Sequence, residues 1–256
     1  MTKVIMPAVF IGHGSPENAL ESNKYTKAWE SLSQKIPRPK AILCISAHWF
    51  TDKTVISNSN EPQLIYDFYG FKDELYNVKY PVKGSSDLAE QVKDLLKPIL
   101  DLEYDNTWGI DHGAWVPIMK MFPEADIPVV QLSLDYNKKA ESHYQLAKAL
   151  KPLREQGVLI IASGNIVHNL GVISFDDVNS PYDWAEKFDN QIANLITNQQ
   201  HQEIIRLSEA SLSVPTPEHY LPLLYILALQ EETETMTSFV DGIVYKSISM
   251  RSYLLS

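Results

Sequence analysis

The feature that most constrains this chain is an apolar run that stops at a histidine between two glycines. The run covers Val4 to Ile11, and Gly12-His13-Gly14-Ser15-Pro16 follows it directly. An apolar run without alternation is typical of a strand that is buried on both faces. Glycine on each side of His13 permits tight or left-handed backbone geometry and lets a ligand come close to the chain. We therefore expect a buried strand that presents His13 at its carboxyl end.

Two further apolar runs lead to a histidine in a similar way. Ala41 to Ala47 runs into His48, and Val158 to Ser163 runs into a glycine turn that leads to His168. Ligands of open α/β sheets bind outside the carboxyl ends of the strands. Three imidazoles that follow buried strands therefore indicate a metal or catalytic centre.

Helical and strand patterns alternate along the rest of the chain. Helices are expected over Lys24–Lys35, from an N-cap at Ser86, over Pro117–Phe122, from Ala140 to Gly157, and from Ser180 through Leu195. Further strands are expected over Ile127–Leu132 and in the alternating tail from Phe239 to Tyr253. Such alternation predicts an α/β fold with a mostly parallel central sheet and helices on both faces. The 256 residues carry no linker or repeat, so we expect a single domain over residues 1–256.

Composition excludes several classes of partner. The net charge is −10, which argues against binding to a phosphate backbone, so no nucleic-acid partner is expected. No run approaches the roughly 18 apolar residues that cross a bilayer, so no membrane association is expected. The N-terminal segment lacks the pattern of a signal peptide, and the single cysteine, Cys44, permits no internal disulfide. We expect a cytoplasmic protein, and nothing in the chain indicates an oligomeric state.

The other four histidines differ in their surroundings. His112 lies in a glycine-containing loop, and His219 lies near a helix start that Pro222 must either distort or delay. His143 and His201 are expected on solvated helix faces, without a role. A lone histidine at a strand end is usually a core or capping residue, but several together favour a metal site, because neutral imidazole binds first-row metals well.

Other chemistries are less well supported by the sequence. The glycine spacing around Ser15 differs from that of a hydrolase nucleophile elbow, so Ser15 is interpreted as a turn residue. Cys44 lies mid-strand and is interpreted as an inert core thiol. The chain has neither a phosphate-binding loop nor a dinucleotide-binding fingerprint. The aromatic stretch from Tyr66 to Tyr80 either packs internally or forms a loop that lies over a flat ring.

Several segments, taken in order, resemble one enzyme family. They are Gly12-His13-Gly14-Ser15-Pro16, Ser46-Ala47-His48-Trp49, Tyr66-Asp67-Phe68-Tyr69-Gly70-Phe71, Asp111-His112-Gly113, Ser163-Gly164-Asn165-Ile166-Val167-His168-Asn169 and Pro217-Glu218-His219-Tyr220-Leu221-Pro222. Together they resemble the class III extradiol ring-cleavage dioxygenases of the LigB superfamily, in particular its 4,5-DOPA extradiol dioxygenase branch. The resemblance extends from Met6 to about Ser249, and it implies a LigB-like fold.

The resemblance implies a single divalent metal held by His13, His48 and His219. It places His168 at the same centre, as an acid/base or a fourth ligand, and His112 nearby as a residue that binds substrate. The implied reaction opens a DOPA-like catechol with O₂ to a muconic semialdehyde. Fe²⁺ is implied for ring cleavage, yet a mainly histidine set also suits Zn²⁺. The better-studied relatives use two histidines and a carboxylate, whereas here Glu218 lies beside the third histidine.

Two alternatives remain open on the sequence alone. One is a zinc hydrolase that uses His13, His48, His168 and a metal-bound water with a pKa near 7. Against it, no clear carboxylate base shares a motif with the histidines, apart from Glu218. The other is a metal-binding protein without enzymatic activity. The presence of further histidines argues against that alternative, because a scaffold has no use for a proton shuttle.

Overall fold

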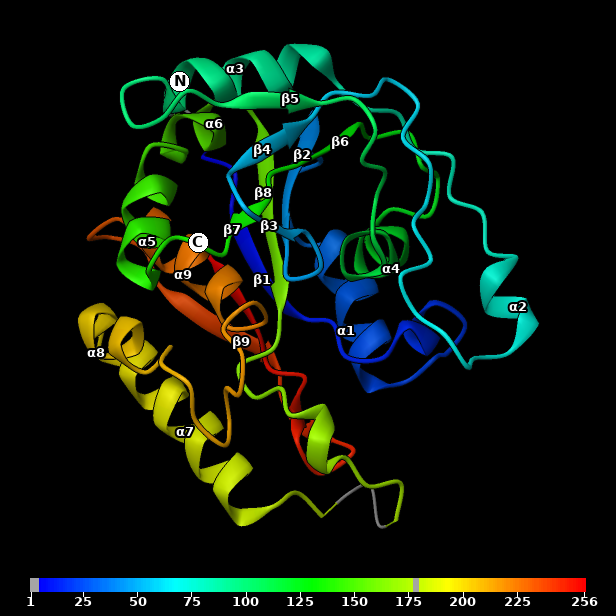
Figure 1. Ribbon diagram of the computed structural model, residues 1–256, viewed down its shortest axis with the longest axis vertical. Helices are drawn as coiled ribbons and strands as arrows, with labels where there is room; N and C mark the ends of the chain where they lie inside the picture. Colours follow the sequence, from blue (N-terminus) through cyan, green and yellow to red (C-terminus); the bar gives the residue numbers. More distant parts are fainter. Residues whose placement is uncertain (1–4, 177–179) are drawn as a thin grey trace.

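The structure is a computed structural model that describes residues 5–176 and 180–256 (Figure 1). Its centre is a six-stranded sheet whose strands lie in the order β6 (Val129–Gln131), β2 (Ala41–Ser46), β8 (Val158–Gly164), β1 (Ala8–Gly12), β12 (Ser252–Leu255) and β9 (Met236–Val240). The first four strands are parallel, and β12 runs antiparallel to both of its neighbours. The prediction of a mostly parallel sheet is confirmed, and the tail forms strands as predicted, with β9 paired to β12.

The three strands that lead to histidines lie side by side in register. β1, β2 and β8 are buried along their whole length, because both faces of the sheet are covered. Gly12 pairs with Gly164, and Ser46 pairs with Ser163. The three carboxyl ends therefore reach the same edge of the sheet at the same level.

Helices cover both faces of the sheet, as predicted (Figure 1). One face carries α1 (Lys24–Ser33) and α4 (His112–Met121); the other carries α3 (Ser86–Leu96), α5 (Ala140–Lys148), α6 (Lys151–Glu155), α7 (Asp183–Thr197), α8 (His201–Arg206) and α9 (Leu221–Leu229). Successive strand residues point to opposite faces, so Ile160 joins one apolar core and Ile161 the other. Each fully buried side chain of this size stabilises the fold by about 1.5–3 kcal/mol.

Short elements connect these layers. They are η1 (Pro16–Ala19), β3 (Phe50–Thr51), β4 (Val55–Ser57), α2 (Asp73–Tyr76), β5 (Glu103–Asp105), β7 (Leu134–Asp135), η2 (Leu170–Val172), β10 (Ile243–Val244) and β11 (Ile248–Ser249). The small strands pair as β3 with β7, β4 with β5, and β10 with β11. Within the described residues, no helix is both long enough and apolar enough to span a membrane.

Several helix boundaries differ from the predictions. Ser85 rather than Ser86 is the N-cap of α3, and α7 begins at Asp183 rather than beside Ser180. α4 begins at His112 rather than at Pro117, because Asp111 caps it by accepting a hydrogen bond from the Ala114 N–H. The helix predicted from Ala140 to Gly157 is divided into α5 and α6 at residues 149–150, although Gly157, with a φ of 87°, does follow its end. α9 begins at Leu221, so Pro222 lies in its first turn and delays the helix rather than distorting it.

The prediction that His143 lies on a solvated face is wrong. Its side chain is 1% exposed, because α9 covers this side of α5. The ring makes hydrogen bonds with the Tyr225 hydroxyl and the Asp135 carbonyl, both at 3.1 Å. His201 is half-buried rather than solvated, and its ring lies 2.8 Å from the Tyr144 hydroxyl. Both histidines are held in the fold away from the strand ends that carry His13 and His48.

Candidate metal and substrate site

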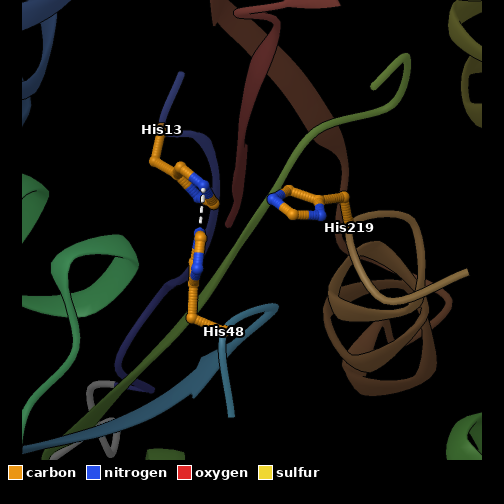
Figure 2. Close-up of side chains that lie close together, drawn as sticks. All are labelled: His13, His48 and His219. Carbon is orange, nitrogen blue, oxygen red and sulfur yellow. Dashed lines mark hydrogen bonds between the residues drawn. The ribbon is translucent and has the colours of Figure 1, made fainter. Parts of the chain in front are cut away.

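Three imidazoles converge at the carboxyl edge of the sheet. Figure 2 shows His13 from the end of β1, His48 from the end of β2 and His219 from the segment before α9, with their rings directed at one another. The Nε2 atoms of His13 and His48 lie 3.1 Å apart, and one nitrogen from each of the three rings lies within 4.8 Å of the others. Nitrogens that bind one ion at about 2.0–2.1 Å have separations of this order. The donor set therefore fits a single divalent metal.

The protonation state of two of these rings suits metal binding. Burial, followed by the neighbouring histidines, lowers the pKa of His13 and of His219 well below its usual value. Metal coordination requires the neutral imidazole, so these rings are already in the form that binds. A metal would also relieve the crowding of several nitrogen lone pairs in one buried space.

The strand ends orient the His13 ring. Its Nδ1 lies 2.9 Å from the Ser163 hydroxyl at the end of β8, and Ser163 in turn donates to the Gly113 carbonyl. This contact engages one ring nitrogen and leaves Nε2 directed at the cluster. Gly14, the next residue, has a φ of 62°, and a Cβ there would lie 2.3 Å from the sulfur of Met250. Glycine after His13 is therefore required by both conformation and space.

His219 is positioned by contact with the end of β8. Its carbonyl accepts a hydrogen bond of 2.8 Å from the Asn165 backbone N–H. A Cβ at Gly164 would lie 2.2 Å from that same carbonyl oxygen, so only glycine permits this approach. The His219 Nδ1 also lies 3.3 Å from a Glu218 carboxylate oxygen. Gly164, the last residue of β8, thus helps to position His219, which is 55 positions later in the chain.

Asp67 joins two histidines of the cluster. Its two carboxylate oxygens lie 2.9 Å from the Nδ1 atoms of His48 and His112, and one also accepts the His112 backbone N–H at 3.0 Å. Burial opposes the charge on Asp67, but the contacts with His112 and His48 outweigh it and lower the pKa of Asp67. The same carboxylate outweighs burial at His48 and raises the pKa of that imidazole. Both rings therefore present Nε2 to the cavity.

The sequence analysis did not assign a role to Asp67. It found no clear carboxylate base in a sequence motif with the histidines except Glu218, and the fold adds Asp67, which reaches His48 and His112 from a separate segment. The available signal was an acid within an aromatic stretch that has no regular period. His112 was expected in a loop but is the first residue of α4, where the Asp67 carboxylate accepts its free N–H.

His168 completes the group from the opposite side. Its ring stacks on that of His219, and burial, then His48 and His112, lowers the pKa of His168 to about 3. The His168 backbone N–H donates to the Ser213 carbonyl at 3.0 Å, which fixes the segment after β8. All five histidines that the sequence analysis selected line one cavity: His13, His48, His112, His168 and His219.

The cavity has a volume of about 430 Å³, within the range of small-molecule sites. Phe68 and Phe71 form one wall, and Leu170, Ile173 and Phe175 contribute apolar surface elsewhere. Phe68 also packs edge-on against the His112 ring, so the aromatic stretch serves both packing and cavity lining. Two other hollows are larger, at about 510 and 640 Å³, but their described linings contain no such group of imidazoles. Chemistry rather than size identifies the site.

A histidine cluster in contact with a carboxylate, placed in a cavity with a largely apolar lining, is a site of the kind that metal-dependent enzymes use to bind a small molecule. The family model described as the catalytic LigB subunit of aromatic ring-opening dioxygenase matches residues 6–253. The chain belongs to this family, and it is an extradiol ring-opening dioxygenase that uses O₂. Family membership favours this interpretation over the zinc hydrolase and over the protein without activity.

Named relatives extend over most of the chain. A protein of Escherichia coli K12 named 4,5-DOPA dioxygenase extradiol is 45% identical over 258 residues, which cover 98% of this chain and 95% of that protein. A Beta vulgaris protein of the same name is 42% identical and covers 86% of this chain and 85% of its own length. A crystal structure of an uncharacterized Escherichia coli K12 protein superposes with a TM-score of 0.86 at 41% identity, covering 98% of this chain and 100% of the other. The LigB-like fold is confirmed.

Proposed function

We propose that the chain forms one catalytic domain over residues 1–256 and opens the ring of a DOPA-like catechol next to its diol, giving a muconic semialdehyde. The observation that carries this proposal is the convergence of His13, His48 and His219 in a cavity whose lining is largely apolar. The printed names of the Escherichia coli and Beta vulgaris relatives support the choice of substrate.

His13, His48 and His219 would hold the ion, with His168 as an acid/base or a fourth ligand. Bound Fe²⁺ supplies the electron transfer between ring and O₂, which Zn²⁺ cannot supply because it has no redox chemistry. A zinc-loaded protein should therefore bind a catechol without opening its ring. Asp67 acts through His48, since it holds the ring by Nδ1 and increases the basicity of Nε2.

His168 and His112 would move protons during the reaction. His168 is neutral at pH 7, so it can accept a hydrogen bond from a catechol hydroxyl. The negative charge of an ionising catechol would raise the pKa of His168 toward the range in which it can take up that proton and return it as the ring opens. Asp67 fixes His112 by its Nδ1, and the remaining nitrogen can hydrogen-bond to a substrate oxygen. Phe68 and Phe71 contact the ring and exclude water from one side of it.

The test is to load the metal-free protein with Fe²⁺ under anaerobic conditions and then add L-DOPA and air. We expect oxygen uptake and the appearance of a yellow semialdehyde chromophore. The same protein loaded with Zn²⁺ is the matched control, and it should bind L-DOPA without consuming oxygen. Absence of oxygen uptake with every catechol tried, from protein shown to hold iron, would overturn the proposal.

A further inference from the structure

The wall of the cavity that contains the histidines carries negative charge that no lysine or arginine of the described lining balances. Besides those histidines, its described lining carries two formally charged side chains, Glu17 and Asp67, and no lysine or arginine. Asp67 is engaged at the floor by His48 and His112. Glu17 is therefore the carboxylate that remains for a ligand.

Glu17 is held in a defined position relative to the metal ligands. It lies in η1, four residues after His13, and its backbone N–H donates to the Ser15 hydroxyl at 3.2 Å. The Asn18 side chain of the same turn donates to the His13 carbonyl at 2.9 Å, which ties η1 to the metal site. The side chain of Glu17 is half-buried and forms no ion pair with the described part of the chain. The Ser15 hydroxyl donates a long hydrogen bond of 3.5 Å to the Glu17 carboxylate, which orients the carboxylate but leaves its charge without a cation.

The surroundings of Glu17 strengthen its effect. Tyr245 lines the same cavity, and burial, followed by the Glu17 carboxylate, raises the pKa of its phenol. The adjacent lysine, Lys246, lies over the Tyr182 ring at 5.8 Å and does not line the cavity. Apolar side chains, Ile173 and Phe175 among them, lower the local dielectric, so a charge near Glu17 is felt more strongly than in water.

We propose that Glu17 is a specificity-determining residue that pairs with an ammonium group on the side chain of the substrate. This inference rests on the proposed function, in which the diol of a catechol is held at the histidine floor. The ring substituent must then extend along the wall of the cavity, where Glu17 is the available charge. The enzyme should prefer catechols with a cationic side chain over neutral ones, and neutral ones over catechols whose side chain ends in a carboxylate.

Repulsion between like charges explains why catechols whose side chain ends in a carboxylate rank last. A carboxylate at the end of the substrate side chain would approach Glu17 and would find no lysine or arginine on the described lining. DOPA carries both an ammonium and a carboxylate, so it should rank below dopamine, although the Tyr245 hydroxyl on the lining can donate to its carboxylate. A bound divalent metal would not change the order, because the same two catechol oxygens would offset its charge in each of the substrates compared.

Binding to the zinc-loaded protein tests this proposal without oxygen chemistry. Calorimetry would measure Kd for dopamine, 4-methylcatechol and 3,4-dihydroxyphenylacetate in the unchanged protein, in Glu17→Gln and in Glu21→Gln. Glu21 is an exposed carboxylate from the same segment that does not line the cavity, which makes it a matched control. Glu17→Gln should lower the preference for dopamine over 4-methylcatechol by about 10-fold to 100-fold, the usual effect of losing a hydrogen bond to a charged group. Glu21→Gln should leave this preference unchanged.

Two further measurements make the result decisive. Glu17→Lys should reverse the order and favour 3,4-dihydroxyphenylacetate, and added salt should weaken the preference of the unchanged protein for dopamine. An equal dopamine preference in Glu17→Gln and in the unchanged protein would overturn the role of Glu17. That outcome is independent of catalysis: a lack of oxygen uptake in the iron-loaded protein removes the dioxygenase proposal and still leaves the order of binding measurable.

Discussion

His168 lies flat against His219, with ring centroids 3.4 Å apart and planes inclined by 7°. Two rings in this arrangement cannot both carry a positive charge without strong repulsion, and the pKa of each is lowered by burial and by neighbouring histidines. A proton taken up by His168 would therefore lie directly over the His219 ring. The stacking therefore favours the neutral form of the His168 ring.

Replacement of His168 should therefore affect rate more than structure. His168→Ala should lower kcat by roughly 10²–10⁴-fold, as is typical for the loss of a general acid/base, and His112→Ala should behave similarly. Steady-state oxygen uptake by iron-loaded protein measures this. Near-full activity in His168→Ala would contradict its role, whereas a parallel loss of iron would identify it as a fourth ligand.

The three converging imidazoles should be required for metal binding. His13→Ala or His48→Ala should abolish stoichiometric binding, since each removes one of three donors and leaves its partners around an unfilled position. Elemental analysis after desalting measures the bound metal, and circular dichroism reports the fold. His201→Gln, outside the cavity, is the matched control and should retain one ion per chain.

Asp67→Asn preserves the shape of the side chain and removes its charge. The His48 ring should become less basic and the His112 ring less constrained, because both lose a carboxylate partner. We expect metal affinity to fall by about 10–100-fold, the usual effect of removing such a partner. Competition with a chelator measures this affinity. Asp73→Asn, an exposed residue of α2, should retain the original affinity.

Gly164→Ala tests the contact that positions His219. The added methyl group would lie 2.2 Å from the His219 carbonyl, so the backbone must move. We expect a loss of roughly 1–3 kcal/mol in the free energy of unfolding, with weaker metal binding as His219 shifts. Urea unfolding and metal titration measure the two effects. Unchanged values in both measurements would show that the close approach has no role.

The stability of the metal-free protein should fall in acid. The pKa of His168 is about 3 in the folded chain and returns to its usual 6.5 on unfolding. Between these values the unfolded chain binds the proton first, so stability decreases as the pH falls from 6.5 towards 3 and is fully present above 6.5. One such group contributes at most about 1.4 kcal/mol per pH unit. Urea unfolding at pH 7 and pH 5 should show this loss, and His168→Gln should reduce it.

The sheet could be predicted from the sequence because its strands carry a strong local signal. β1, β2 and β8 are buried on both faces, so each is a continuous apolar run. Parallel strands place their carboxyl ends at one edge, and that rule made the grouping of His13, His48 and His168 predictable. The boundaries of α4 were harder, since Gly113 and Pro117 are weak helix formers whose placement depends on tertiary packing.

Contacts between segments that are distant in the sequence explain why the burial of His143 and the role of Asp67 were not predicted. The period of a helix shows that His143 shares a face with other residues, but it does not show that Tyr225, 82 positions later, covers that face. Asp67 lies in a stretch without any period, and its role follows only from where the loop meets His48 and α4. Local pattern identifies donors at strand ends, whereas it cannot identify a partner that approaches them from a loop.

The position of β12 has a consequence for the order in which the site forms. β1 pairs with β8 on one side and with β12, residues 252–255, on the other. The Gly12 N–H donates to the Ser252 hydroxyl, and Met250 packs where Gly14 must stay small. Because Gly12 and Ser252 are 240 positions apart in the chain, the edge that supports His13 closes only when distant segments have come together, so metal capture should follow the closure of the sheet.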